Sequence, residues 1–339
     1  MLEKVSIVIP TLNAGSVLEP CLKSISIQDY PKSKIEIIVA DGGSTDNTLE
    51  LAKKYGAKVV SNPLKTGESG KAVGVRKATG KFIALVDSDN ILPNRKWLKQ
   101  MVGPLEKHPE AVGSEPWKYT WRKEDGFITR YCALIGMNDP FVHFVGNYDR
   151  FNLITGKWTE VPRKEENFKD YILVGLDKRG VPTIGANGTV FRSSYLKKEL
   201  KSDYLFDIDI LAQTIFEKGE VKFIKVKNGI IHTYCERDIR KFAKKQRRRV
   251  RDFLFHKFVE KDRSFKWESE GPSGMIKFIL SCVLVFPLVI DALRGFSKKK
   301  DPAWFFHILA CEITLWEYGV GTIASLFKNR ELDRKNWSQ

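Results

Sequence analysis

The chain has 339 residues, a net charge of +16 at pH 7, 42% hydrophobic and 29% charged residues, and five cysteines. This length can bury a large core, and the composition is that of a globular protein. The cysteines lie far apart and form no CxxC pair, which argues against a zinc-finger site or a disulfide framework and favours a reducing compartment.

The positive charge is concentrated in one segment. Residues 237–266 contain 13 Lys and Arg against 4 Asp and Glu. Such a patch favours an anionic partner: nucleic acid, a phospholipid surface or a phosphorylated substrate. Residues 1–4 lead directly into an apolar run without a signal-peptide pattern, so we expect the catalytic part to stay in the cytoplasm.

The first hundred residues alternate short apolar strands with amphipathic helices. Strands are predicted over residues 5–9, 34–40, 58–61 and 81–86, and helices over residues 15–27, 46–55 and 70–79. Repeated βα units predict an α/β fold with a doubly wound, parallel sheet and helices on both of its faces.

The middle of the chain is harder to interpret. Residues 113–180 give no clear elements. Further along, the pattern predicts a flexible loop over residues 185–188, a strand over 189–192, a helix from Asp207 to about Gly219, a strand over 221–226 and a basic amphipathic helix over 239–258.

Two apolar stretches occupy the C-terminal quarter. Residues 275–293 are long enough to span a bilayer, whereas residues 304–327 include His307, Glu312 and Glu317. Because the loop over residues 294–300 is strongly basic, two spans would violate the positive-inside rule. We expect a helical hairpin that lies in, or dips into, the cytoplasmic leaflet. Two true spans, or two buried helices of a globular domain, are the alternatives.

Acidic residues follow the strand predicted over residues 81–86. Asp87, Ser88 and Asp89 come directly after the apolar run, and ligands of α/β sheets bind beyond the carboxyl ends of such strands. Carboxylates at that position can hold a hard divalent cation, which in turn can neutralise a diphosphate. The alternative is a solvated turn, for which these residue types are also suited.

Taken together, these segments resemble the family 2 glycosyltransferases of the GT-A fold. The resemblance is carried by residues 5–13, 37–46, 70–80 and 87–89, in the family's order and spacing. It is strong over residues 1–110, fair over residues 183–250 and absent from the C-terminal hairpin. It implies a GT-A type, doubly wound and mostly parallel sheet, to which this chain adds a membrane-associated helical hairpin.

The resemblance also suggests a functional division of the chain. Residues 1–112 would form a nucleotide-sugar-binding half, and residues 113–236 an acceptor-binding and catalytic-base half. Residues 237–270 would form a basic amphipathic helix region, and residues 271–339 an apolar hairpin with a basic tail.

A UDP- or GDP-sugar site is implied at the matching positions. The residues concerned are Pro10, Thr11, Asn13, Asp41, Lys71, Asp87, Ser88, Gly185 and Asn187. The Asp41 carboxylate could accept a hydrogen bond from a uracil or guanine imide, or it could cap its own turn. Many relatives have two adjacent acids where this chain has Asp41 and Gly42. Lys71 stands where an arginine is common and should lie near the donor phosphates, with a solvated helix lysine as the alternative.

A divalent cation, Mn²⁺ or Mg²⁺, is implied at Asp87, Asp89 and His232. His232 resembles a histidine that completes the metal shell in some GT-A enzymes, and an imidazole ligand suits Mn²⁺ better than Mg²⁺. The alternative for His232 is a packed or surface histidine.

A hydroxyl acceptor requires a carboxylate that takes its proton. Relatives place this base in an acidic pair at the start of a helix, and here Phe206 replaces the usual glutamate before Asp207. Asp207 therefore aligns best with the base and Asp209 is the competitor. Either could instead stabilise the helix N-terminus.

The basic helix contains Gln246, Arg247 and Arg249, in a segment similar to the QxxRW motif of processive relatives. Val250 stands in place of the tryptophan, so processivity is not inferred. We expect these three side chains to face a diphosphate or a lipid phosphate, with a solvated basic face as the alternative.

The sequence thus predicts a metal-dependent, inverting glycosyltransferase. Its acceptor would be a hydroxyl of a lipid-linked or polymeric glycan at the cytoplasmic face of the cell membrane, where residues 275–327 would anchor the protein. Transfer to polyprenyl phosphate, which needs no base, is one alternative. A nucleic-acid-binding protein that uses residues 240–251 is another, but it explains neither the strand-end acids nor the hairpin, so no nucleic-acid partner is expected. A nucleotidyltransferase is a weaker alternative, because residues 10–16 lack the Gly-rich phosphate loop of such enzymes.

Overall fold

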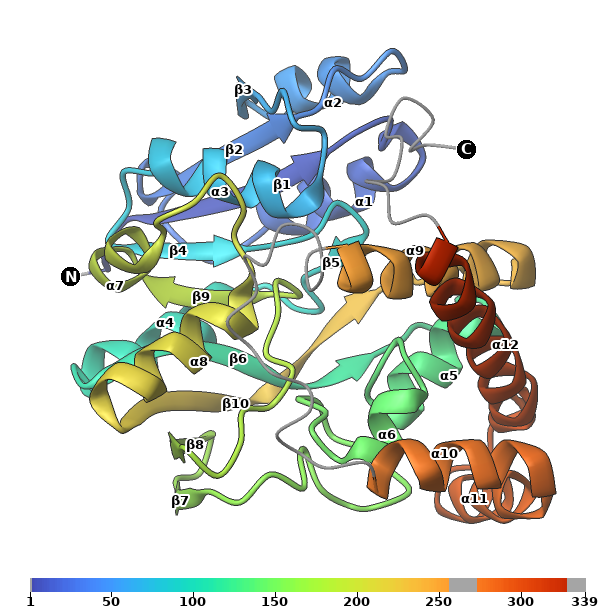
Figure 1. Cartoon of the computed structure of the whole chain (residues 1–339). Coiled ribbons are helices and arrows are strands. Elements are labelled where there is room, and N and C mark those ends of the chain that lie inside the picture. Colours follow the sequence, from blue (N-terminus) through green and yellow to red (C-terminus); the bar gives the residue numbers. More distant parts are fainter. Residues whose placement is uncertain (1, 256–272, 328–339) are drawn as a thin grey trace. The chain divides into compact units, whose positions relative to one another are not determined.

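The computed structural model describes residues 2–255 and 273–327. The end of the helix expected over residues 239–258, and the basic segments before residue 273 and after Phe327, lie outside the described residues. Figure 1 shows the helices and strands of the chain, which divides into two compact units. Of the described residues, unit 1 contains residues 2–117 and 162–232, and unit 2 contains residues 118–161, 233–255 and 273–327. Residues 1–112 and most of residues 113–236 belong to the same unit, unit 1. Their predicted division into a nucleotide-sugar-binding half and an acceptor-binding half stays a prediction.

Unit 1 is built around one ten-stranded sheet. The strand order is β3-β2-β1-β4-β9-β6-β10-β8-β7, and β5 pairs with β10. The strands are β1 (Val5–Thr11), β2 (Ile35–Asp41), β3 (Lys58–Ser61), β4 (Phe82–Leu85), β5 (Asn90–Ile91), β6 (Ala111–Thr120), β7 (Lys164–Asn167), β8 (Tyr171–Asp177), β9 (Thr189–Arg192) and β10 (Glu220–His232).

The sheet has a parallel part and an antiparallel part. Strands β3, β2, β1 and β4 pair in parallel, as the repeated βα pattern predicted. The pairs β4–β9, β9–β6, β10–β8, β8–β7 and β10–β5 are antiparallel, so the sheet as a whole is mixed. Antiparallel neighbours need no crossover helix, which explains why residues 113–180 gave no repeated strand–helix pattern.

The helices of unit 1 are α1 (Gly15–Ser26), α2 (Thr48–Lys54), α3 (Gly67–Lys77), α4 (Trp97–Lys107), α7 (Ser193–Glu199) and α8 (Asp207–Lys218). Helix α3 begins three residues before its predicted start, because Thr66 and Ser69 form a reciprocal capping box. Its glycines allow close packing on β1. A Cβ at Gly74 would lie 2.3 Å from a methyl group of Val8, and one at Gly70 would lie 2.8 Å from the Cβ of Pro10.

Unit 2 is helical. It contains α5 (Phe127–Ile135), α6 (Phe141–Val145), α9 (Ile239–Phe255), α10 (Ser273–Leu284), α11 (Phe286–Lys298), a 3₁₀ turn (Pro302–Phe305) and α12 (Phe306–Phe327). Its core is rich in aromatic rings, and Phe306 contacts both Tyr131 and Phe242 edge to face. Helix α12 packs along α9.

The apolar stretch predicted over residues 275–293 is divided into two helices. Helices α10 and α11 meet at Val285, whose φ is +58°, and the chain bends there by 95°. Pro287 lies in the first turn of α11, where its missing N–H costs no helical hydrogen bond. Among the described residues, no single helix has both the length and the apolar composition for a membrane crossing; taken as a pair, the bent α10 and α11 meet those two criteria.

Candidate active site

The turn after β4 carries Asp87, Ser88 and Asp89. Asn90, which is fully buried, closes this turn: its side-chain oxygen accepts a hydrogen bond from the Asp87 N–H at 3.1 Å, and its own N–H donates to the Asp87 carbonyl at 2.9 Å. The amide group of Asn90 also donates to Oδ1 of Asn187 at 3.1 Å. The structure therefore joins the acidic turn to the loop over residues 185–188, and the predicted contact of Asn187 with a nucleotide-sugar stays a prediction.

His232 lies beside the acidic turn. It is the last residue of β10, where it pairs with Asn90 of β5, and its Nε2 lies 3.2 Å from Oδ1 of Asp89. The pairing of β10 with β5 thus brings the His232 imidazole close to the carboxylate of Asp89, which precedes β5. These are two of the three predicted metal ligands.

The surroundings of the acidic turn favour the protonated form of Asp87. Burial raises the pKa of Asp87 to about 6, the charge of Asp89 adds to this effect, and Lys71 and His232 oppose it. Two carboxylates that share a partly desolvated site favour either a proton or a cation between them. Because the charges of Lys71, His232 and Asp207 all act on Asp87, these groups occupy one electrostatic neighbourhood.

The donor set fits a divalent cation that arrives with a phosphate ligand. Within the described ranges, no group of three or more His, Cys, Asp or Glu side chains is arranged to hold a metal ion by itself. Asp89 and His232 can supply two ligands, and Asp87 lies in the same turn. Mg²⁺-type sites commonly use only one or two protein carboxylates and complete the shell with water and substrate phosphates.

The turns after β1 and β2 form a second polar cluster. Asp41, the last residue of β2, lies opposite Thr11 of β1. Its carboxylate accepts four hydrogen bonds: from the Thr11 hydroxyl, from the N–H groups of Gly43 and Ser44, and from the Ser44 hydroxyl. Asn13, with a φ of +49°, accepts from the Thr45 N–H at 2.8 Å.

These hydrogen bonds support the alternative interpretation, in which the Asp41 carboxylate caps its own turn. Its carboxylate already uses about as many acceptor positions as it has, so a bound base would have to displace one of these bonds. Contact with a nucleotide stays a prediction for Pro10, Thr11, Asn13 and Asp41, which the structure brings together at neighbouring strand ends.

Lys71 and Asp207 form a buried ion pair. Nζ of Lys71 lies 2.7 Å from Oδ2 of Asp207, and the two side chains are only 8% and 7% exposed. Lys71 projects from α3, and Asp207 is the first residue of α8. Among the described residues, Oδ1 of Asp207 has no hydrogen-bond partner. Burial raises the pKa of Asp207, and the neighbouring Lys71 ammonium opposes that rise.

Asp209 lies in the same first helical turn and is also buried. Phe206, rather than either aspartate, is the N-cap residue of α8. The contact with Lys71 distinguishes Asp207 from Asp209. Sequence reasoning did not foresee this ion pair, and it also overlooked Asn90, whose signal was an amide residue directly after the two aspartates.

Gln246, Arg247 and Arg249 are placed differently from the sequence-based expectation. Gln246 is fully buried and donates to the Asn138 carbonyl at 2.9 Å. Arg247, half exposed, makes two hydrogen bonds of 2.6 and 2.8 Å to Glu317 of α12. Arg249 donates a hydrogen bond to the side-chain oxygen of Gln246.

Arg249 also lies 3.6 Å from Asp139, which the Tyr318 hydroxyl contacts as well. These side chains connect α9 to the rest of unit 2, so Gln246 and Arg249 do not form an outward phosphate-facing row. The acids that engage Arg247 and Arg249 lie far away in sequence, so the local charge pattern could not reveal them.

Comparison with known proteins gives a consistent result. The model of the family described as glycosyl transferase family 2 matches residues 6–199, more than half of the chain. The poly(ribitol-phosphate) beta-N-acetylglucosaminyltransferase TarS of Staphylococcus aureus is 34% identical over 115 residues, which cover 32% of this chain and 20% of TarS.

A second relative comes from Methanococcus voltae. This dolichyl N-acetyl-alpha-D-glucosaminyl phosphate 3-beta-D-2,3-diacetamido-2,3-dideoxy-beta-D-glucuronosyltransferase is 34% identical over 110 residues, 30% of this chain and 34% of the relative. The chain thus matches only about a fifth to a third of the length of these curated relatives.

Among solved structures, the mannosyltransferase PcManGT from Pyrobaculum calidifontis, in complex with GDP-Man and Mn²⁺, has a TM-score of 0.55 to this chain. The two are 15% identical over 98% of this chain and 89% of that one, a likeness that concerns the fold. It confirms the predicted GT-A type fold. The family match and the order of the strand-end motifs agree, and the chain belongs to glycosyltransferase family 2.

Proposed function

We propose that this protein transfers a sugar from a nucleoside-diphosphate sugar to a hydroxyl acceptor, with inversion at the anomeric carbon. One observation carries the proposal: a cation-compatible acidic turn and a buried carboxylate with one unbonded oxygen share an electrostatic neighbourhood in unit 1. The first feature suits the leaving diphosphate, and the second suits removal of the acceptor proton.

The donor half of the site would hold the diphosphate. Asp89 and His232, with Asp87 beside them, would bind Mn²⁺ or Mg²⁺. When bound, the cation supplies Lewis-acid stabilisation of the charge that develops on the departing diphosphate. Asn90 and Asn187 tie the acidic turn to the loop over residues 185–188, so backbone of this loop could approach the donor sugar.

The acceptor half would centre on Asp207. Its Oδ1 is buried and available to accept the hydrogen of an acceptor hydroxyl. As the hydroxyl oxygen attacks the anomeric carbon, its proton passes to Asp207 and the bond to the diphosphate breaks on the opposite face. A single displacement of this kind inverts the anomeric configuration.

Donor hydrolysis tests this function without knowledge of the acceptor. A panel of UDP- and GDP-sugars is incubated with the full chain and Mn²⁺, and the released nucleotide is measured. We expect hydrolysis of at least one donor, with loss of the signal in Asp89→Ala and after chelation. Asp203→Ala is the matched control, because Asp203 is an exposed residue that forms a surface ion pair with Arg76. Hydrolysis that survives both chelation and Asp89→Ala would contradict the proposal.

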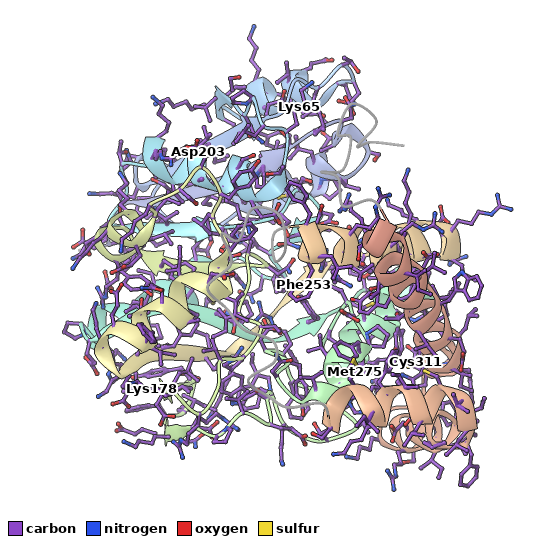
Figure 2. All side chains as sticks on the ribbon, viewed as in Figure 1. Lys65, Lys178, Asp203, Phe253, Met275 and Cys311 are labelled. Carbon is purple, nitrogen blue, oxygen red and sulfur yellow. The ribbon has the colours of Figure 1, made fainter. Side chains whose placement is uncertain are left out.

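We also propose that the protein works at the cytoplasmic face of a membrane, through helices α10–α12. The exposed side of α10 is apolar: Met275, Ile276, Ile279, Leu280, Val283 and Leu284 all present large side chains to solvent, and Figure 2 labels Met275 at the start of this helix. On α12, Leu309, Trp316, Val320 and Ile323 are exposed at helical spacing. Exposed apolar rows of this extent mark interaction surfaces.

Basic side chains accompany these apolar rows. Lys277 lies on α10, Arg294 and Lys298 lie on α11, and Lys299 and Lys300 follow it directly. A cleft of about 470 Å³ in unit 2 is lined by His143, Ile154, Thr155, Asp291, Arg294, Ser297 and Lys298. Apolar helices flanked by cations bind the interfacial region of anionic bilayers.

A membrane location suits a lipid-linked or polymeric acceptor. By their names, the two relatives act on poly(ribitol-phosphate) and on a dolichyl-linked sugar phosphate, which supports this class of acceptor. Flotation with anionic phospholipid vesicles tests the location. We expect the full chain to float, and Val283→Asp with Leu284→Asp to remain in the dense fraction. Equal flotation of both forms would contradict an interfacial role for α10.

Transfer to polyprenyl phosphate is a second candidate, and the exposed apolar helices favour it as well. A phosphate acceptor is already ionised and needs no base. This alternative therefore predicts that Asp207→Asn and Asp209→Asn both keep their activity.

A further inference from the structure

The Lys71–Asp207 pair is fixed by the packing of two helix N-termini. Gly70, next to Lys71, packs directly on Pro10 of β1, so no larger residue fits there. The N–H of Leu205, two residues before Asp207, donates to the Glu68 carbonyl in the first turn of α3 at 3.0 Å. The ammonium and the carboxylate are therefore held together by backbone that is itself bonded across the two helix starts.

This pair is a poor arrangement for a general base. An adjacent ammonium stabilises the charged form of a carboxylate and so lowers its affinity for a proton. At the same time, Oδ1 of Asp207 is buried without a hydrogen-bond partner among the described residues, which costs free energy. Buried polar atoms without a hydrogen bond are few in native proteins, and perturbed ionisable groups cluster at functional sites.

Lys71 has several acidic neighbours. The charges of Asp207, Glu68 and Asp87 all act on its ammonium, and together they keep its pKa above the usual range although burial alone would lower it. A nucleoside diphosphate that binds at the acidic turn would add a stronger anion, and the cation that accompanies it would compensate Asp87. The diphosphate would then compete with Asp207 for Lys71.

We propose that Lys71 exchanges partners during the reaction: it pairs with Asp207 before the donor binds and with the donor diphosphate afterwards, which leaves Asp207 free to act as the base. This inference rests on the proposed function. It makes Lys71 a positioning residue for Asp207, in addition to a ligand of the donor phosphates. The base would thus be released only when a donor is present, which limits unproductive activation of the acceptor.

The exchange of Lys71 from Asp207 to the diphosphate accompanies the bond changes of the transfer step. The acceptor oxygen forms a bond to the anomeric carbon, and its proton moves to Oδ1 of Asp207. The bond from the anomeric carbon to the diphosphate oxygen breaks, and the electron pair leaves with the diphosphate, whose charge Lys71 then shares.

Proton uptake on nucleotide binding tests the exchange without an acceptor. UDP and GDP are titrated into the full chain with Mn²⁺ by calorimetry at about pH 6, in two buffers of different ionisation enthalpy. The difference between the buffers gives the number of protons bound. If Lys71 leaves Asp207, the carboxylate gains proton affinity, so the wild-type protein should take up more protons than Asp207→Asn.

Two further variants complete the test. In Lys71→Met, Asp207 has already lost its cation, so the excess uptake should disappear; in Lys71→Arg, which keeps the charge, it should persist. Lys54→Met is the matched control and should behave as wild type, since Lys54 forms an exposed ion pair with Glu19. Nucleotide binding with equal proton uptake in wild type and Asp207→Asn would overturn the exchange and leave the proposed function intact. Failure of every nucleotide to bind would instead overturn the proposed function, and the exchange with it.

Discussion

The two units use the same kinds of charged side chain in different ways. In unit 1, burial and, after it, the charge of Asp89 raise the pKa of Asp87 to about 6. In unit 2, the buried acid Glu317 accepts two hydrogen bonds from Arg247. Burial alone would raise the pKa of Asp291, but the hydrogen bond and charge of His143 lower it overall.

This contrast separates functional charge from structural charge. An acid that a protein needs only for stability is most favourable when its charge is fully compensated by the fold itself. An acid whose charge is left in excess is destabilising, and it is retained where a ligand supplies the compensation. By this criterion we propose the strand ends of unit 1 as the site, whereas the Arg247–Glu317 pair links α9 to α12 within unit 2.

The largest expected effect concerns Asp207. In Asp207→Asn, transfer to a hydroxyl acceptor should fall by about 10³-fold, because a general base contributes roughly 10²–10⁴ in rate. Nucleotide binding should be retained. The measurement is kcat with a saturating donor, and Asp209→Asn serves as the matched control. An equal or larger loss in Asp209→Asn would assign the base to Asp209 instead.

Removal of the cation should have the next largest effect. Chelation, or Asp89→Ala, should reduce transfer and donor hydrolysis by about 100-fold, equivalent to ~3 kcal/mol of transition-state stabilisation. Added Mn²⁺ should restore the chelated wild-type protein and leave Asp89→Ala inactive. Full activity of the chelated protein would mean that Lys71 and helix dipoles compensate the diphosphate without a metal ion.

The raised pKa of Asp87 should make the free energy of unfolding depend on pH. Asp87 has a pKa of about 6 in the folded protein and a reference value of 3.8, so the folded state holds a proton that the unfolded chain has lost. The free energy of unfolding should therefore decrease as the pH rises from about 4 to 6, and the loss should persist above that range.

Asp87→Asn removes this charge, so it should stabilise the metal-free protein at neutral pH by about 1–3 kcal/mol, and the gain should vanish near pH 4. Thermal unfolding in the presence of a chelator, compared with Asp203→Asn, measures the effect. A destabilised Asp87→Asn at neutral pH would show that the carboxylate is compensated after all.

The smallest expected effect lies in unit 2. Arg247→Ala should lower the free energy of unfolding by only about 0.5–1 kcal/mol, because the Arg247 side chain is 55% exposed and solvent screens its pair with Glu317. Nucleotide binding and kcat should not change. A double-mutant cycle with Glu317→Ala isolates the pair energy, and a loss of nucleotide affinity would show that the α9 cations contact the substrate after all.

The sequence alone was sufficient for the parallel half of the sheet and for its motifs. Hydrophobic periodicity is a local property, and β3 was predicted at its observed bounds while β1, β2, β4 and α3 differ from prediction only at their ends. Because parallel strands end at one edge of a sheet, the positions of Asp41, Asp87 and Asp89 followed from the same pattern. The family match confirms the resemblance that these motifs carry.

Only the tertiary structure decided which distant side chains meet. Lys71 and Asp207 are 136 residues apart, and Asn90 and Asn187 are 97 apart, so no local pattern encodes either contact. Likewise, Gln246 and Arg249 were expected to face a diphosphate or a lipid phosphate, but Gln246 donates to the Asn138 carbonyl and Arg249 lies beside Asp139. Ion pairs and hydrogen bonds depend on separations of a few ångströms, and those separations are set by how the helices and strands pack.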